Sequence, residues 1–158
     1  MLRLHNKKEI DIKGGKFTLS QRNELGDLLS SDKTDVEKFE GVFEILYSFK
    51  PSPIEYKFLI NIFNRTIDGL NHWFKSERDL LKYDYDADEL SAGIKEYSEK
   101  IGALGTVLAI AKTFGKDPDE ILRWEYGKVF GILLNDLESS KYRQRYDKVL
   151  QRKYKIKT

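Results

Sequence analysis

The residue types that most often carry catalysis are few in this sequence, and they are far apart. The two histidines, His5 and His72, are separated by a distance that matches no metal-ligand spacing. The acidic string DYDADEL, from Asp84 to Leu90, resembles part of a calcium loop. It lacks the central glycine and the distal glutamate that such a loop requires, so we interpret it as the start of a helix.

Other chemical signatures are also missing from the sequence. Gly14-Gly15 and the segment IGALG (101–105) match neither a phosphate-binding loop nor a dinucleotide fingerprint, and no serine stands in a nucleophile elbow. The chain has no cysteine, which excludes disulfides, thiolate zinc sites and cysteine nucleophiles. We expect a protein that is not an enzyme and uses no cofactor or metal. An enzymatic role would require a pocket that gathers Asp, Glu and His72 from distant segments.

The composition is that of one folded domain spanning residues 1–158. Forty per cent of the residues are hydrophobic and 34% are charged, which is ordinary for a globular protein. No run approaches 18 apolar residues, and the first residues lack the apolar core of a signal peptide. We therefore expect a cytoplasmic protein with no membrane partner.

Charge is distributed unevenly along the chain. Residues 138–158 hold eight basic and two acidic residues, whereas the first 137 residues hold 20 basic and 24 acidic ones. A basic end on an acidic body can bind phosphate groups or an acidic protein surface, or it can simply remain solvated.

The hydrophobic pattern predicts a mainly α fold, a bundle of five to six helices with a small N-terminal β-hairpin. Residues 9–19, EIDIKGGKFTL, alternate polar and apolar around a Gly-Gly pair, which predicts the hairpin. Helices are predicted over about 20–31, 33–49 and 54–82 from apolar residues recurring every three or four positions. The third should be the spine of the fold.

A later helix should place Leu90, Ile94 and Tyr97 on one face and continue to Phe114. Within it, the glycines at 102 and 105 are expected to mark a bend or a close helix contact, because glycine costs roughly 1 kcal/mol against alanine in a helix interior.

A tight helix corner is predicted around residues 115–124. Gly115 should end one helix, Asp117 should cap the next, and Pro118 should occupy its first position. The spacing up to Trp124 is also that of a helix-turn-helix. However, acidic residues at 117, 119 and 120 would repel phosphates where a recognition helix meets DNA, so we favour a structural corner over DNA reading.

The last helix carries the candidate binding surface. Apolar residues from Tyr126 to Leu137 form one seam that should lie in the core, and after Ser139-Ser140 the pattern changes phase. The second part mixes tyrosine with arginine and lysine, a combination typical of binding surfaces. The candidate partner-binding residues are Tyr142, Arg143, Arg145, Tyr146, Lys148, Arg152 and Tyr154. We favour a protein partner over nucleic acid.

Three segments resemble the tail assembly chaperones of tailed bacteriophages: FTLSQRNELGDLL, EKFEGVFEILY and AKTFGKDPDEILRWEYGKVFGILLNDLESSKYRQRYDKVL. The resemblance implies a non-enzymatic, mostly helical protein of the host cell cytoplasm that binds the tape-measure protein and brings tail-tube subunits to it. It implies that residues 117–124 form the helix corner and that residues 142–153 contact the partner. The predicted hairpin and long central helix depart from the simplest members of that family.

Two alternatives stay open at this point. A structural virion component, such as a neck or tail-completion protein, would have a similar composition. A nucleic-acid-binding protein could act through the basic end or through the helix corner. Self-association is left open as well.

Overall fold

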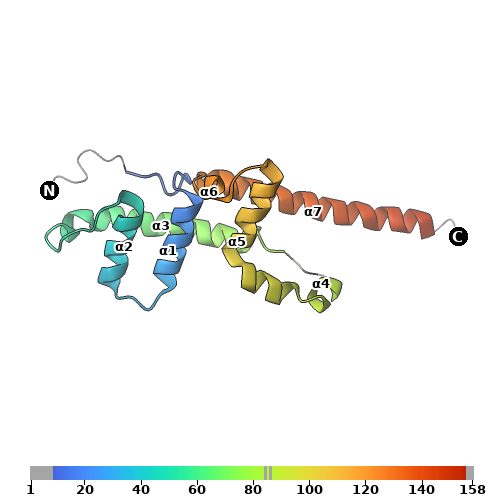
Figure 1. Cartoon of the computed structure of the whole chain (residues 1–158), viewed down its shortest axis with the longest axis horizontal. Helices are drawn as coiled ribbons and strands as arrows, with labels where there is room; N and C mark the ends of the chain where they lie inside the picture. The colour runs from blue at the N-terminus through green and yellow to red at the C-terminus, as the bar shows by residue number, and fades with distance from the viewer. Residues whose placement is uncertain (1–8, 84, 86, 156–158) are drawn as a thin grey trace.

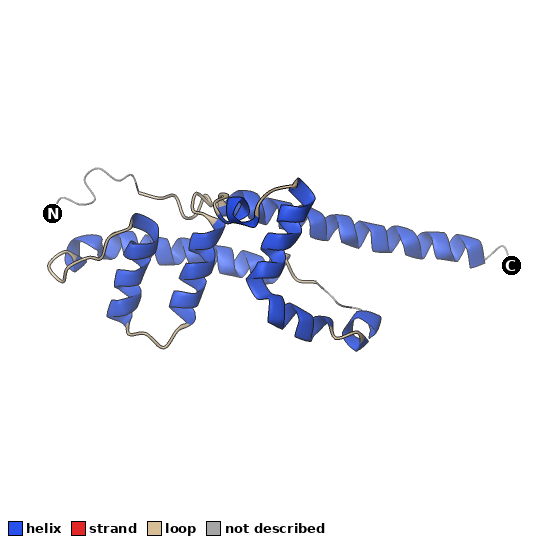
Figure 2. Ribbon diagram, viewed as in Figure 1, coloured by secondary structure: helices blue, strands red, loops and turns tan. Residues whose placement is uncertain are grey.

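The computed structural model describes residues 9–83, residue 85 and residues 87–155. Over these residues the chain folds into seven α-helices and contains no β-strand (Figure 1, Figure 2). The predicted mainly α class is confirmed. His5, Asp84 and the last three residues of the basic end lie outside the described residues.

The first two helices, α1 (Leu19–Ser30) and α2 (Asp35–Tyr47), lie side by side (Figure 1). Each begins with a capping box, in which a threonine side chain and a residue three positions later satisfy each other's backbone N–H groups. Thr18 forms this pair with Gln21 in α1, so the helix begins at Leu19, one residue before the predicted start at about residue 20. Gly41 lets the two helices approach, because a Cβ there would lie 2.7 Å from Cδ2 of Leu28.

The 25-residue α3 (Tyr56–Leu80) runs behind α1 and α2 as the predicted spine (Figure 1). Aromatic rings join it to α2: the Phe39 ring lies 4.8 Å from that of Tyr56 and 4.9 Å from that of Phe63, centroid to centroid. Tilted ring pairs at this separation add to the stabilisation from apolar burial.

Glycine conformations divide the next part of the chain. Gly93, with φ of 81°, separates the short α4 (Ala87–Ser91) from α5 (Ile94–Phe114). The predicted bend is confirmed at Gly102, where φ is 50° and ψ is −137°, a conformation that side-chain-bearing residues rarely adopt. Gly115 ends α5 in the left-handed conformation, as predicted.

Two helices complete the chain, α6 (Pro118–Leu122) and the 30-residue α7 (Tyr126–Lys155). The breaks at Gly93 and between α6 and α7 bring the described helices to seven, not the five to six expected. The first half of α7 packs in the core, with Tyr126, Val129 and Phe130 buried. Its second half extends beyond the other helices (Figure 1). The fold is therefore not a closed bundle.

The predicted N-terminal hairpin is wrong. Among the described residues 9–18 the backbone turns at residues 12–15, and the one ladder-like contact is an isolated bridge between Thr18 and Glu125. The carbonyls of Gly15 and Phe17 accept hydrogen bonds from the N–H groups of Gly127 (3.1 Å) and Tyr126 (2.6 Å). The segment thus satisfies free donors at the N-terminus of α7 instead of pairing with itself.

Candidate functional site

The two halves of α7 present apolar residues on opposite faces. Tyr126, Val129 and Phe130 turn toward the core. At 3.6 residues per turn, Tyr142, Tyr146 and Val149 share a face that lies roughly 180° around the helix from this seam. Because the stripe points away from the side that packs on the core, the same core cannot cover it.

The three residues of this face, Tyr142, Tyr146 and Val149, are called the distal stripe below. Their exposed fractions are 61%, 51% and 46%. The two tyrosine rings stack, with centroids 6.2 Å apart and planes inclined by 21°. The two rings therefore lie nearly parallel beside each other on the projecting part of the helix. Exposed apolar residues gathered in this way mark interaction surfaces more often than scattered single ones do.

A row of cations runs beside the distal stripe. Lys141, Arg145, Lys148 and Arg152 follow one another at intervals of four, three and four residues, so they share one neighbouring face of the helix. We call them the basic ridge. Lys141 is paired with Glu138 at 3.1 Å. Within the described residues the other three form no ion pair, so their charge is available to a partner.

The structure brings most of the predicted partner residues together, but not all. Tyr142 and Tyr146 lie in the distal stripe, and the cations at 145, 148 and 152 lie in the basic ridge. Arg143 and Tyr154 are on the other flank, about 100–120° around the helix from Tyr142. Measured from the middle of the stripe, Arg143 and Tyr154 lie about as far around the helix as the basic ridge does, but in the other direction.

The helix corner has a structural role. Asp117 caps α6 by accepting a hydrogen bond from the N–H of Asp119 (2.8 Å), and Pro118 lies in the first turn. The Trp124 ring packs edge-on against Phe114, with centroids 5.4 Å apart. Lys128 Nζ lies 3.6 Å from the centroid of the Trp124 ring. These contacts hold α5, α6 and the start of α7 in a fixed relation.

A polar cluster that sequence patterns did not reveal anchors the base of α7. Glu77 of α3 accepts hydrogen bonds from Arg22 Nε of α1 (3.0 Å) and from the Tyr126 hydroxyl of α7 (2.6 Å). A second guanidinium nitrogen of Arg22 also contacts Glu77. The Arg22 guanidinium lies 5.2 Å from the Phe74 ring centroid, a cation–π contact.

Titration in this cluster reflects burial and mutual contact. Burial, followed by the hydrogen bond to Glu77, raises the pKa of Tyr126 above its ordinary value. Burial alone would lower the pKa of Arg22, but its hydrogen bond and charge interaction with Glu77 raise it. The cluster therefore favours a neutral tyrosine and a charged arginine. No residue spacing signals it, because 55 residues separate Arg22 from Glu77.

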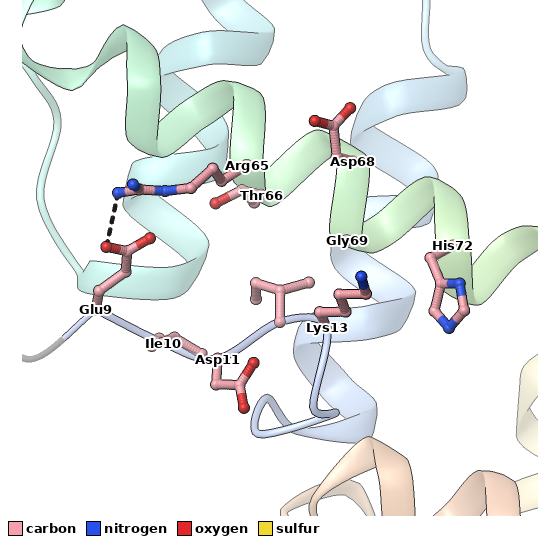
Figure 3. A pocket seen from close by; sticks show the side chains of 10 residues that line it. Glu9, Ile10, Asp11, Lys13, Arg65, Thr66, Asp68, Gly69 and His72 are labelled. Atoms are coloured by element: carbon pink, nitrogen blue, oxygen red, sulfur yellow. Dashed lines mark hydrogen bonds and ion pairs between the residues drawn. The ribbon is translucent and has the colours of Figure 1, made fainter.

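One hollow does gather Asp, Glu and His72 from distant segments. It has a volume of about 510 Å³ and lies between residues 9–13 and α3 (Figure 3). Glu9 is paired with Arg65 at 2.8 Å, and Asp11 accepts a hydrogen bond from the N–H of Gly14. The side chains of Asp11, Asp68 and His72 point in different directions (Figure 3). Nothing in this arrangement places an acid and a base on one reacting atom.

Two further findings concern the described residues alone. No group of three or more His, Asp or Glu side chains in this part of the chain is arranged to hold a metal ion. No described helix is both long enough and apolar enough to span a bilayer.

Known proteins give no guide to the role of this surface. No family model matches the sequence, and neither the curated proteins nor the solved structures contain a significant match.

Proposed function

We propose that this chain is a non-enzymatic assembly factor that binds other polypeptides through the distal half of α7. The observation that carries the proposal is the distal stripe: three apolar or aromatic side chains, about half exposed, on the face of a projecting helix that turns away from the core. A stripe at positions i, i+4 and i+7 is the pattern that packs against another helix.

The chemistry of the surface indicates its occupant. Burying the exposed parts of two tyrosines would remove roughly 200 Å² from water, worth about 5 kcal/mol at 25 cal/mol per Å² before the costs of association. The basic ridge beside them favours a ligand with carboxylates along one edge. The best-matched ligand is an amphipathic helix whose apolar side is flanked by acidic residues.

The resemblance to phage tail assembly chaperones makes this proposal specific. The tape-measure protein of a phage tail is long and helical, so it offers many such helices, and the tail-tube protein is the second expected partner. In this proposal the chain acts in the host cytoplasm, where it holds the tape-measure protein while tube subunits are brought to it.

Co-purification tests the proposal. The chain would be co-expressed with the tape-measure and tail-tube proteins encoded in the same genome, with and without Tyr142→Ser and Tyr146→Ser. Phe58→Ser serves as the matched control, because Phe58 is an aromatic residue that is also 51% exposed but lies on α3. We expect wild type and control to retain a partner and the double variant to lose it. Retention of neither protein by the wild type would overturn the proposal.

A nucleic-acid-binding role is the second candidate, favoured by the regular spacing of the basic ridge. The three cations of the ridge that form no ion pair within the described residues could each neutralise a phosphate. A salt titration with duplex DNA separates the two roles: affinity falling steeply with salt would support nucleic-acid binding, and undetectable binding at low salt would exclude it. Mass spectrometry of purified particles would show whether the chain is instead a structural component of the virion.

A further inference from the structure

We propose that the chain also associates head to tail with a second copy of itself, whose α4–α5 region covers the distal stripe and the basic ridge of α7. This inference rests on the proposed function, since it takes the same surface of α7 to be a polypeptide-binding surface. The second copy would occupy that surface when no assembly partner is present.

The α4–α5 region has the charge that the basic ridge requires. Residues 82–104 contain three basic residues, Lys82, Lys95 and Lys100, and six acidic residues, Asp84, Asp86, Asp88, Glu89, Glu96 and Glu99. Among those that the structure describes, Asp88, Glu96 and Glu99 are exposed. From residue 141 to residue 155 the balance is reversed, with seven basic residues and Asp147 as the one acid.

The same region also has apolar side chains for the distal stripe. Leu90 of α4 is 44% exposed, and Tyr97 of α5 is 60% exposed. Leu104, just after the bend at Gly102, is 57% exposed. Each of the two regions therefore combines exposed apolar groups with a net charge, and the two net charges have opposite signs. Contact between the two regions would bury apolar surface, and their opposite charges would attract the two copies toward each other.

One hydrogen bond shows on which face of α7 the residue just before the α4–α5 region lies. Gln144 Nε2 donates to the hydroxyl of Tyr83 at 3.2 Å, and Tyr83 immediately precedes the acidic segment. Gln144 is two residues from both Tyr142 and Tyr146 and five from Val149, so it lies about 140–160° around the helix from the distal stripe. Tyr83, just before the α4–α5 region in the chain, thus contacts α7 on the face opposite the stripe, so contact between the α4–α5 region and the stripe requires a second copy.

An interface between two different surfaces has a definite consequence for assembly. It is heterologous, so each copy keeps one free surface of each kind after the first contact, and association continues into a chain or closes into a ring. It should weaken as salt screens the exposed charges. A tape-measure helix that binds the distal stripe would compete with it.

Sedimentation velocity over a range of protein concentrations, at low and at high salt, tests this inference. Two charge-reversed variants are needed. The α7-reversed variant carries Arg145→Glu and Lys148→Glu, and the α5-reversed variant carries Glu96→Lys and Glu99→Lys. All four positions are exposed, and far-UV circular dichroism would verify that each variant is folded.

We expect the wild type to gain mass with concentration at low salt and each variant alone to stay monomeric. An equimolar mixture of the two variants should associate again, because each one carries the charge that complements the other. A third variant, Tyr97→Ser with Leu90→Ser, should weaken wild-type association without any change of charge, which guards against an effect of charge on folding.

Three results would overturn the inference. A wild type that is monomeric at every concentration would overturn it. If that monomer still captured the tape-measure protein, the proposed function would stand. Undiminished association of the α5-reversed variant alone would indicate contact between two α7 helices instead. Undiminished association of the α7-reversed variant alone would indicate contact between two α4–α5 regions. Conversely, association as described without capture of either tail protein would leave this inference standing and remove the proposed function.

Discussion

Glu77 is the residue whose replacement tests most directly how the base of α7 is held. Glu77→Gln keeps the size of the side chain but removes the charge that Arg22 and the Tyr126 hydroxyl face. The Arg22 and Glu77 side chains are only 25% and 19% exposed, so solvent replaces the lost interaction poorly. A hydrogen bond to a charged group contributes about 1.5–3 kcal/mol, and three are weakened here, two from Arg22 and one from Tyr126. We expect the free energy of unfolding to fall by about 2–3 kcal/mol.

Urea denaturation followed by circular dichroism measures this change. Asp136→Asn is the matched control, because it also removes one carboxylate from a helix, at an exposed position, and should stay within about 0.5 kcal/mol of wild type. A double-mutant cycle with Arg22→Met should give a coupling energy of about 1–2 kcal/mol. A Glu77→Gln variant as stable as the control, or a coupling near zero, would show that the cluster does not stabilise the fold.

Three further predictions concern the elements around this cluster. Tyr126→Phe should cost about 1–2 kcal/mol at neutral pH. Since the pKa of Tyr126 is raised in the folded state, its contribution is complete below the unfolded pKa near 10 and declines at higher pH. In denaturation curves the difference from wild type should therefore be constant up to about pH 10 and shrink above it. Gly15→Ala should cost about 3 kcal/mol, because φ there is 72° and a Cβ would lie 2.7 Å from Gly127 Cα. Thermal melts would measure this loss. In the same experiment Gly127→Ala should change stability by less than about 1 kcal/mol, since its Cβ would meet Gly14 O at 3.4 Å, an ordinary contact. Equal losses of stability in the Gly15 and Gly127 variants would refute the steric argument. Asp117→Ala should cost about 1 kcal/mol through loss of the α6 cap, and an unchanged melting temperature would contradict the capping role.

Helical periodicity predicted the parts of the fold that depend on one segment at a time. The stripe from Tyr56 to Leu80 became one long helix, and the Asp117-Pro118 start of α6 is present as expected. The phase change after residue 140 was visible for the same reason. Once residues 126–155 form one continuous helix, the spacing alone decides that Tyr142 and Tyr146 share a face away from the core seam.

Features that depend on contacts between distant segments were not predictable in this way. The alternation around Gly14-Gly15 suits a hairpin, but it equally suits a turn that buries Ile12 and Phe17 while its carbonyls accept hydrogen bonds from the start of α7. Both arrangements satisfy the same polar and apolar pattern. In the sequence Arg22 and Glu77 look like ordinary charged residues of a helix surface, because their contact exists only in the folded chain.

The central claim is that the distal half of α7 is where another polypeptide binds. Amide hydrogen exchange of the chain, at a concentration where it is monomeric, with and without the proposed partner, a tape-measure protein, tests it most directly. We predict slower exchange concentrated in residues 141–154, with little change in α1 and α2. Binding of the tape-measure protein that leaves the amides of residues 141–154 as fast as in the free chain would contradict the claim.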